Sequence, residues 1–129
     1  MTGSDIYNAA LALTGEPPTS QGDYDTAVVL GLLNIIICEV FPYNNIRREA
    51  AGMKPLDTIP TLVAMDDSPG YETVLERECM PYGLAAHLML SDDETGKAQF
   101  FNQKYEYSRE TLASAVLGEV KDVYGEDEE

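Results

Sequence analysis

The stretch that decides the fold is residues 78–115, ECMPYGLAAHLMLSDDETGKAQFFNQKYEYSRETLASA. Its first part, about residues 82–90, is apolar on nearly every side, and His87 is its only strongly polar side chain. A helix that is apolar all round is a buried helix. The pattern therefore predicts a helix in the middle of the fold.

The second part of the same stretch predicts a long amphipathic helix. Its apolar stripe recurs at steps of three and four residues and consists of Ala98, Phe101, Tyr105, Ser108, Leu112 and Ala115. The polar residues 91–93 separate the two helices and offer caps, and Gly118 is well placed to end the second helix. We expect the longest helix to lie within residues 94–118.

The N-terminal part of the chain predicts two further helices. Ser4 can cap a first helix, which Gly15 ends. Asp23 or Asp25 can cap a second helix through the apolar run of residues 27–41. That run is shorter than the roughly 18–20 residues that cross a bilayer, and polar residues interrupt it, so we expect no membrane span.

The middle of the chain predicts a long loop. Residues 44–51 form a separate helix or continue the second helix after a bend at Pro42. Residues 53–70 contain three prolines and have little helical periodicity. Part of this segment, near residues 58–64, could be a short strand. A loop of this length in a compact domain is usually functional.

The fold expected from these patterns is all-α, a small helical bundle with a long central loop and a disordered acidic C-terminal tail. Its 129 residues suit one helical domain over residues 1–118, followed by the acidic tail at residues 119–129. Two helices that are apolar all round are difficult to hide in a chain of this size. The surplus apolar surface predicts that the chain forms a homo-oligomer.

The charge and the titratable residues argue against most enzymatic and binding chemistry. The formal net charge of −15 disfavours binding to nucleic acid phosphates or to anionic membranes. His87 is the single histidine, and a lone histidine on a buried helix is most often a core residue. Cys38 and Cys79 are far apart in sequence and are expected as two free, buried thiols in a reducing compartment. We therefore expect no enzyme, no metal and no cofactor, and the N-terminus does not have the pattern of a signal peptide.

Several short motifs, taken in order, resemble one protein family. Residues 80–86 (MPYGLAA) are followed by Ser-Asp-Asp at residues 91–93, and then by Ala98, Phe101, Asn102 and Tyr105. Upstream, residues 45–49 (NIRRE) precede the pattern Leu56-x-x-Ile59-Pro60-x-Leu62. Over about residues 5–115, the chain resembles the small head–tail connector proteins, also called adaptor or head-completion proteins, of long-tailed bacteriophages.

The resemblance implies a virion structural protein at the head–tail interface, made in the cytoplasm of the host bacterium. Such proteins form a ring, commonly of twelve copies, below the portal protein. The ring extends the DNA channel, links the capsid to the tail, and meets a tail-side connector or tail terminator protein on its other side. Packaged DNA passes through without tight binding, which suits a negatively charged wall.

This interpretation nominates two sets of residues. The candidates for contacts between subunits are Ile59, Leu62, Met65, Tyr71, Tyr82 and Tyr105. The candidates for lining the channel are the loop carboxylates Asp57, Asp66, Asp67, Asp92 and Asp93. An alternative interpretation, which rests on charge alone, is a small acidic DNA mimic that inhibits a nucleic-acid-binding enzyme. The oligomeric state separates the two, because a mimic is usually a monomer or a dimer.

Overall fold

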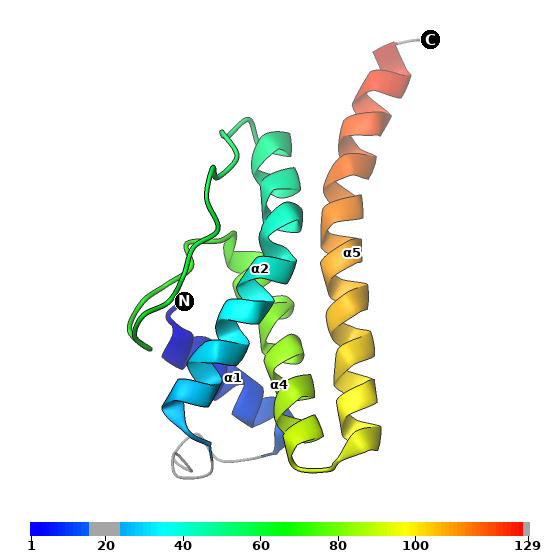
Figure 1. Cartoon of the computed structure of the whole chain (residues 1–129). Coiled ribbons are helices and arrows are strands. Elements are labelled where there is room, and N and C mark those ends of the chain that lie inside the picture. The colour runs from blue at the N-terminus through cyan, green and yellow to red at the C-terminus, as the bar shows by residue number, and fades with distance from the viewer. Residues whose placement is uncertain (16–23, 128–129) are drawn as a thin grey trace.

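The structure, a computed structural model, describes the backbone of residues 1–15 and 24–127 and the side chains of residues 1–15 and 24–114 (Figure 1). The described chain is mostly helical, with no strand, which confirms the expected all-α class. Its helices are α1 (Gly3–Thr14), α2 (Thr26–Ala50), α3 (Thr73–Glu78), α4 (Met80–Ser91) and α5 (Thr95–Asp127).

Helix α4 lies at the centre and packs against each of the other four helices, as its all-round apolar sequence predicts. Leu84, Ala85 and Leu88 have no exposed surface. Gly83 allows a close approach to α5, because a Cβ atom at this position would lie 2.9 Å from the ring of Tyr105. Contacts with α5 are the most extensive that α4 makes.

Helix α5 is the longest helix and runs beside α4 and α2 (Figure 1). The predicted stripe is confirmed at Ala98, Phe101 and Tyr105, which are buried. The predicted end at Gly118 is wrong, because the helix continues to Asp127. A glycine in a helix costs only about 1 kcal/mol and need not stop it. The disordered tail expected over residues 119–129 is therefore not found up to residue 127, and residues 128–129 lie outside the described chain.

Helix α1 begins at a capping box, and its N-cap is not the residue that was expected. The N-cap is Thr2 and not Ser4, since the Thr2 hydroxyl accepts a hydrogen bond from the Asp5 amide at 3.2 Å. The Asp5 carboxylate in turn accepts one from the Thr2 amide at 3.0 Å, and this bond to the carboxylate lowers the pKa of Asp5. Gly15 ends the helix in a left-handed conformation (φ 87°), as expected.

Helix α2 is one continuous helix of 25 residues that passes through Pro42. Asp25 caps it, and its carboxylate accepts a hydrogen bond from the Ala27 amide at 2.9 Å. Pro42 has no N–H to donate to the Cys38 carbonyl one turn earlier. Both residues lie on the exposed side of the helix, where water can satisfy that carbonyl. Of the two arrangements considered for residues 44–51, the continuation is the correct one.

The long loop is present over residues 51–72, but the short strand considered near residues 58–64 is not. The side chain of Asn34 on α2 takes the place of a partner strand. Its Nδ2 donates to the Leu62 carbonyl at 3.0 Å, and its Oδ1 accepts from the Leu62 amide at 2.8 Å. One side-chain amide thus satisfies both backbone groups of Leu62, which a strand would otherwise have paired.

Candidate assembly surface

The outer face of α2 is an exposed stripe without charged residues. It consists of Val28, Gly31, Ile35, Cys38 and Pro42, at successive steps of three and four residues. Val28 is 52% exposed and Ile35 is 50% exposed. At 1.5 Å per residue the stripe is about 21 Å long. We call these five residues the α2 stripe.

The other sides of α2 are occupied within the protomer. Val29, Leu33, Ile36, Ile37 and Val40 face the core and have no exposed surface. A second side holds the loop, because the Asn45 side chain exchanges hydrogen bonds with Leu56 in the way that Asn34 does with Leu62. The α2 stripe is therefore the side of this helix that the protomer leaves uncovered.

A third side of α2 meets α5 through polar and aromatic groups. The Tyr105 hydroxyl donates to the Glu39 carboxylate at 2.8 Å, and burial raises the pKa of Tyr105. The Arg109 guanidinium lies between the rings of Tyr43 and Tyr105, at 4.9 and 5.0 Å from their centroids. Arg47 adds a hydrogen bond to the Leu112 carbonyl at 2.8 Å. These contacts hold α2 against α5.

Half of the expected subunit-contact residues lie inside the protomer. Leu62, Tyr71 and Tyr105 are 3%, 5% and 4% exposed, so their assignment as contacts between folded subunits is corrected. The Tyr71 hydroxyl donates to the Ile37 carbonyl at 2.7 Å within the core. The loop was expected to be an assembly element, but Leu62 serves to anchor it to its own protomer.

The remaining three candidates keep accessible surface. Ile59 is 45% exposed, and Met65 and Tyr82 are half-buried. Met65 also has a role within the protomer, since its carbonyl accepts a hydrogen bond from the Ser4 amide at 2.9 Å at the start of α1. These three residues stay candidates for contacts between subunits.

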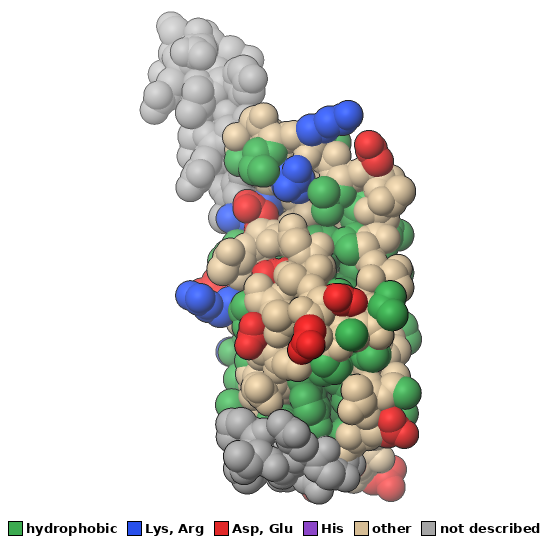
Figure 2. Space-filling view, turned by 90° about the vertical axis from the view of Figure 1, so that its left-hand side faces the viewer, with side chains coloured by type: hydrophobic (Ala, Val, Ile, Leu, Met, Phe, Trp, Pro, Cys, Tyr) green, Lys and Arg blue, Asp and Glu red, His purple; other side chains and the backbone are tan. Residues whose placement is uncertain are grey.

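The five expected channel carboxylates are all exposed, but they belong to two separate segments. Asp57, Asp66 and Asp67 lie on the loop, whereas Asp92 and Asp93 lie in the turn between α4 and α5. Acidic side chains are scattered over the face that carries the loop (Figure 2). Two of the five have structural roles. Asp67 accepts the amides of residues 63 and 64, which lowers its pKa, and Asp92 accepts the hydroxyl of Tyr24.

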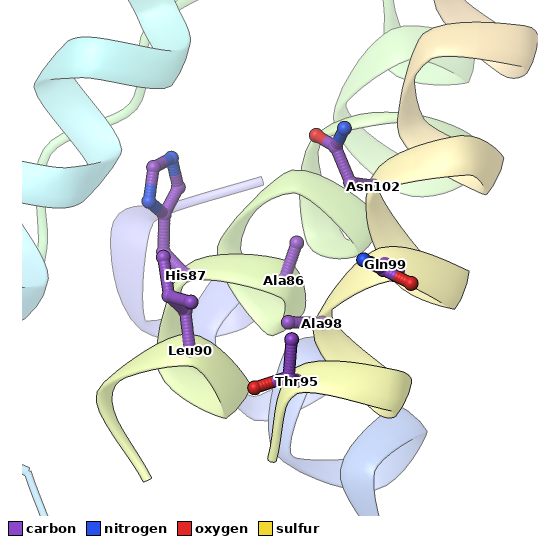
Figure 3. Close-up of a pocket in the computed structure, with 7 residues that line it drawn as sticks. All are labelled: Ala86, His87, Leu90, Thr95, Ala98, Gln99 and Asn102. Atoms are coloured by element: carbon purple, nitrogen blue, oxygen red, sulfur yellow. The ribbon is translucent and has the colours of Figure 1, made fainter. Parts of the chain in front are cut away.

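A shallow hollow of about 280 Å³ lies between α4 and α5 (Figure 3). It is lined by Ala86, His87, Leu90, Thr95, Ala98, Gln99 and Asn102. His87 was expected in the core but is only partly buried and lies at the rim of this hollow (Figure 3). Within the described residues no group of three His, Cys, Asp or Glu side chains could hold a metal ion. The hollow does not gather the groups that a catalytic site requires.

The two cysteines lie in different environments. Cys79 is buried as expected, and burial raises the pKa of its thiol to about 11. Cys38 is exposed on the α2 stripe, so the expectation of two buried thiols is wrong for this residue. An apolar run in the sequence does not show which of its residues face outward, and this is why Cys38 was misplaced.

Helix α2 also meets the length and composition criteria for a membrane-spanning helix, the one helix of the described chain to do so. No membrane span was expected, because the apolar run of residues 27–41 is short and Gly31, Asn34 and Glu39 interrupt it. One such helix is weak support for a membrane span, since core helices of soluble proteins pass the same criteria. Two polar side chains of α2, Asn34 and Asn45, form hydrogen bonds with the loop of the same protomer.

Sequence reasoning missed the α2 stripe. The signal was available as the spacing of Val28, Gly31, Ile35, Cys38 and Pro42, but it lies within a run that is apolar on all sides. Comparisons of the chain with protein-family models, with curated proteins and with solved structures found no match. Its function must therefore be inferred from its own residues.

Proposed function

We propose that this chain is a virion structural protein, a head–tail connector whose copies form a ring below the portal and extend the DNA channel toward the tail. The observation that carries the proposal is the α2 stripe, an uncharged exposed helix face on a protein with a net charge of −15. Exposed apolar surface that continues over several helical turns marks a contact with another molecule. A second copy of the chain is the partner that a ring requires.

The order of the sequence motifs gives the proposal its place in the virion. The resemblance to head–tail connectors implies a twelve-membered ring, with the portal on one side and a tail-side connector or tail terminator protein on the other. The all-α fold is consistent with that family. The high negative charge suits a channel through which DNA slides, because carboxylates repel phosphates and do not hold them.

The alternative of a DNA mimic is supported by the net charge alone. Several carboxylates that could imitate phosphates have roles inside the protomer. Asp5 and Asp25 cap helices. Asp67 accepts a hydrogen bond from the Val63 amide, and Glu39 accepts one from the Tyr105 hydroxyl. The connector accounts for both the charge and the α2 stripe, and it is therefore the function that we propose.

The test is the oligomeric state of the purified protein, alone and with the portal protein of the phage that encodes it. We expect native mass spectrometry and negative-stain electron microscopy to show closed rings, either of the protein alone or seated on the portal. A chain that stays monomeric at high concentration and does not bind the portal would contradict the proposal. A monomer that instead inhibits a nucleic-acid-binding enzyme would support the mimic.

A further inference from the structure

We infer that the α-amino group of Met1 is a cation on which the fold depends, and that an acyl group on this nitrogen releases the N-terminus from α3. The Met1 nitrogen lies 2.8 Å from Oε1 of Glu76 on α3, and the two groups form an ion pair. Acylation of an amino group removes its charge. The inference is independent of the proposed ring, because every contact in it lies within one protomer.

The carboxylate of Glu76 is buried and requires an opposite charge beside it. Glu76 is 2% exposed, and its Oε2 accepts a hydrogen bond from the Tyr71 amide at 3.2 Å. Among the described residues, no lysine or arginine side chain forms an ion pair with this carboxylate. A buried charge that loses its partner is strongly destabilising. The Met1 amino group is therefore the cation that compensates the buried charge of Glu76.

The first residues of α1 bind the long loop and so place the N-terminus. The amides of Gly3 and Ser4 donate to the loop carbonyls of Asp67 and Met65, each at 2.9 Å. Gly3 fits closely against the loop, since a Cβ atom at this position would lie 3.2 Å from Cδ1 of Leu62. The N-terminus thus joins the loop to α3, and the ion pair lies at its end.

The site accepts an amino group at one position of the chain. A residue placed before Met1 converts its nitrogen into an amide, which can donate one hydrogen bond to Glu76 but carries no charge. Removal of Met1 moves the amino group to Thr2, about 3.8 Å along the chain. The Thr2 nitrogen already donates to the Asp5 carboxylate at 3.0 Å. Either change leaves Glu76 without its cation.

The modification to which this site responds is an acyl group on the Met1 nitrogen. A formyl group is the smallest acyl group, and it leaves one N–H and no charge on the nitrogen. If synthesis of the chain starts with N-formylmethionine, a hydrolysis has to precede the ion pair. Water cleaves the C–N bond of the formamide, and the products are formate and the ammonium group that Glu76 binds.

The experiment compares the full chain, expressed without a tag in bacteria, with and without inhibition of the host deformylase. Intact mass spectrometry identifies the formylated and the free form. We expect the formyl group to lower the melting temperature of the wild type by about 5–10 °C, because it leaves a buried carboxylate unpaired. Hydrogen exchange should show that the amides of Gly3, Ser4 and Tyr71 lose protection, whereas the Leu88 amide in α4 keeps it.

Glu76→Gln separates the ion pair from other effects of the formyl group, because glutamine has the same shape and no charge. The formyl group should lower the melting temperature of this variant by less than about 2 °C. The matched control is Glu78→Gln, at an exposed residue of the same helix, which should keep the full wild-type effect.

Equal melting temperatures of the formylated and the free wild type would overturn the inference, and this comparison stands even if Glu76→Gln does not fold. Equal losses in the wild type and in Glu76→Gln would overturn it as well. The same holds for a purified wild type that begins at a residue other than Met1 and still protects the Tyr71 amide.

Discussion

Asn34→Ala removes the side chain that holds the long loop against α2, and the resulting loss in the free energy of unfolding can be estimated from the structure. The Asn34 side chain makes two hydrogen bonds to Leu62, at 2.8 and 3.0 Å, in a part-buried position. A hydrogen bond of this kind contributes about 1 kcal/mol net. If the loop stays in place, the variant loses about 2 kcal/mol of the free energy of unfolding.

The alternative response gives a similar value. If the loop detaches, Leu62, which is 3% exposed, loses the burial of a leucine side chain. That burial is worth about 2 kcal/mol. The protein adopts the less costly response, so we expect a loss of about 2 kcal/mol in either case.

Urea unfolding measures this loss, and amide hydrogen exchange shows where it arises. The Leu62 amide should lose its protection, whereas amides in α4 should keep theirs. Asn34→Asp is nearly isosteric but cannot donate to the Leu62 carbonyl, so it should also destabilise the protein. The exposed Glu49, on the same helix, is the control, and Glu49→Ala should change stability by less than about 0.5 kcal/mol. Wild-type stability and Leu62 protection in Asn34→Ala would refute the assigned role of Asn34.

Three other predictions concern the core, the helix contacts and DNA. Gly83→Ala should lose about 1–2 kcal/mol in urea unfolding, because its Cβ would press on the Tyr105 ring, whereas Gly31→Ala, in open space, should stabilise the dilute monomer by about 0.5–1 kcal/mol. Leu88→Asp should lower the free energy of unfolding by about 4 kcal/mol or more, because it buries an unpaired carboxylate, and thermal melting should show the loss. The control is Leu90→Asp, at a residue that is 59% exposed. Equal melting temperatures of the two variants would contradict the burial of α4. Fluorescence anisotropy should detect no binding to duplex DNA at physiological salt, since the chain has 8 Lys and Arg against 23 Asp and Glu; tight, salt-dependent binding would contradict the channel role.

The fold class and the central helix could be predicted because their signals are local. The apolar circumference of α4 and the periodic stripe of α5 follow from residue spacing within one segment. The course of the loop could not be predicted. It depends on Asn34 and Asn45, whose partners Leu62 and Leu56 lie elsewhere in the sequence. An asparagine in a helix does not indicate from sequence alone which backbone it will bind.

The burial of an individual residue could also not be predicted where its hydrogen-bond partner lies far away in the sequence. Glu76 lies in a short charged helix, yet it is 2% exposed. Its carboxylate accepts hydrogen bonds from the Met1 amino group at 2.8 Å and from the Tyr71 amide at 3.2 Å. Tyr71 and Tyr105 were expected at interfaces because tyrosine is enriched there, but both hydroxyls have partners within the protomer. Composition statistics do not replace knowledge of those partners.

The most direct test of the account is the reactivity of the Cys38 thiol in the dilute and the assembled protein. Cys38 lies exposed on the α2 stripe, whereas Cys79 is buried with a pKa of about 11 and stays protonated at pH 8. We expect one thiol per chain to react rapidly with an aromatic disulfide reagent in the dilute monomer, and that thiol to be protected after assembly. An assembled protein in which Cys38 reacts as fast as in the monomer would show that the α2 stripe is not the surface that joins the copies.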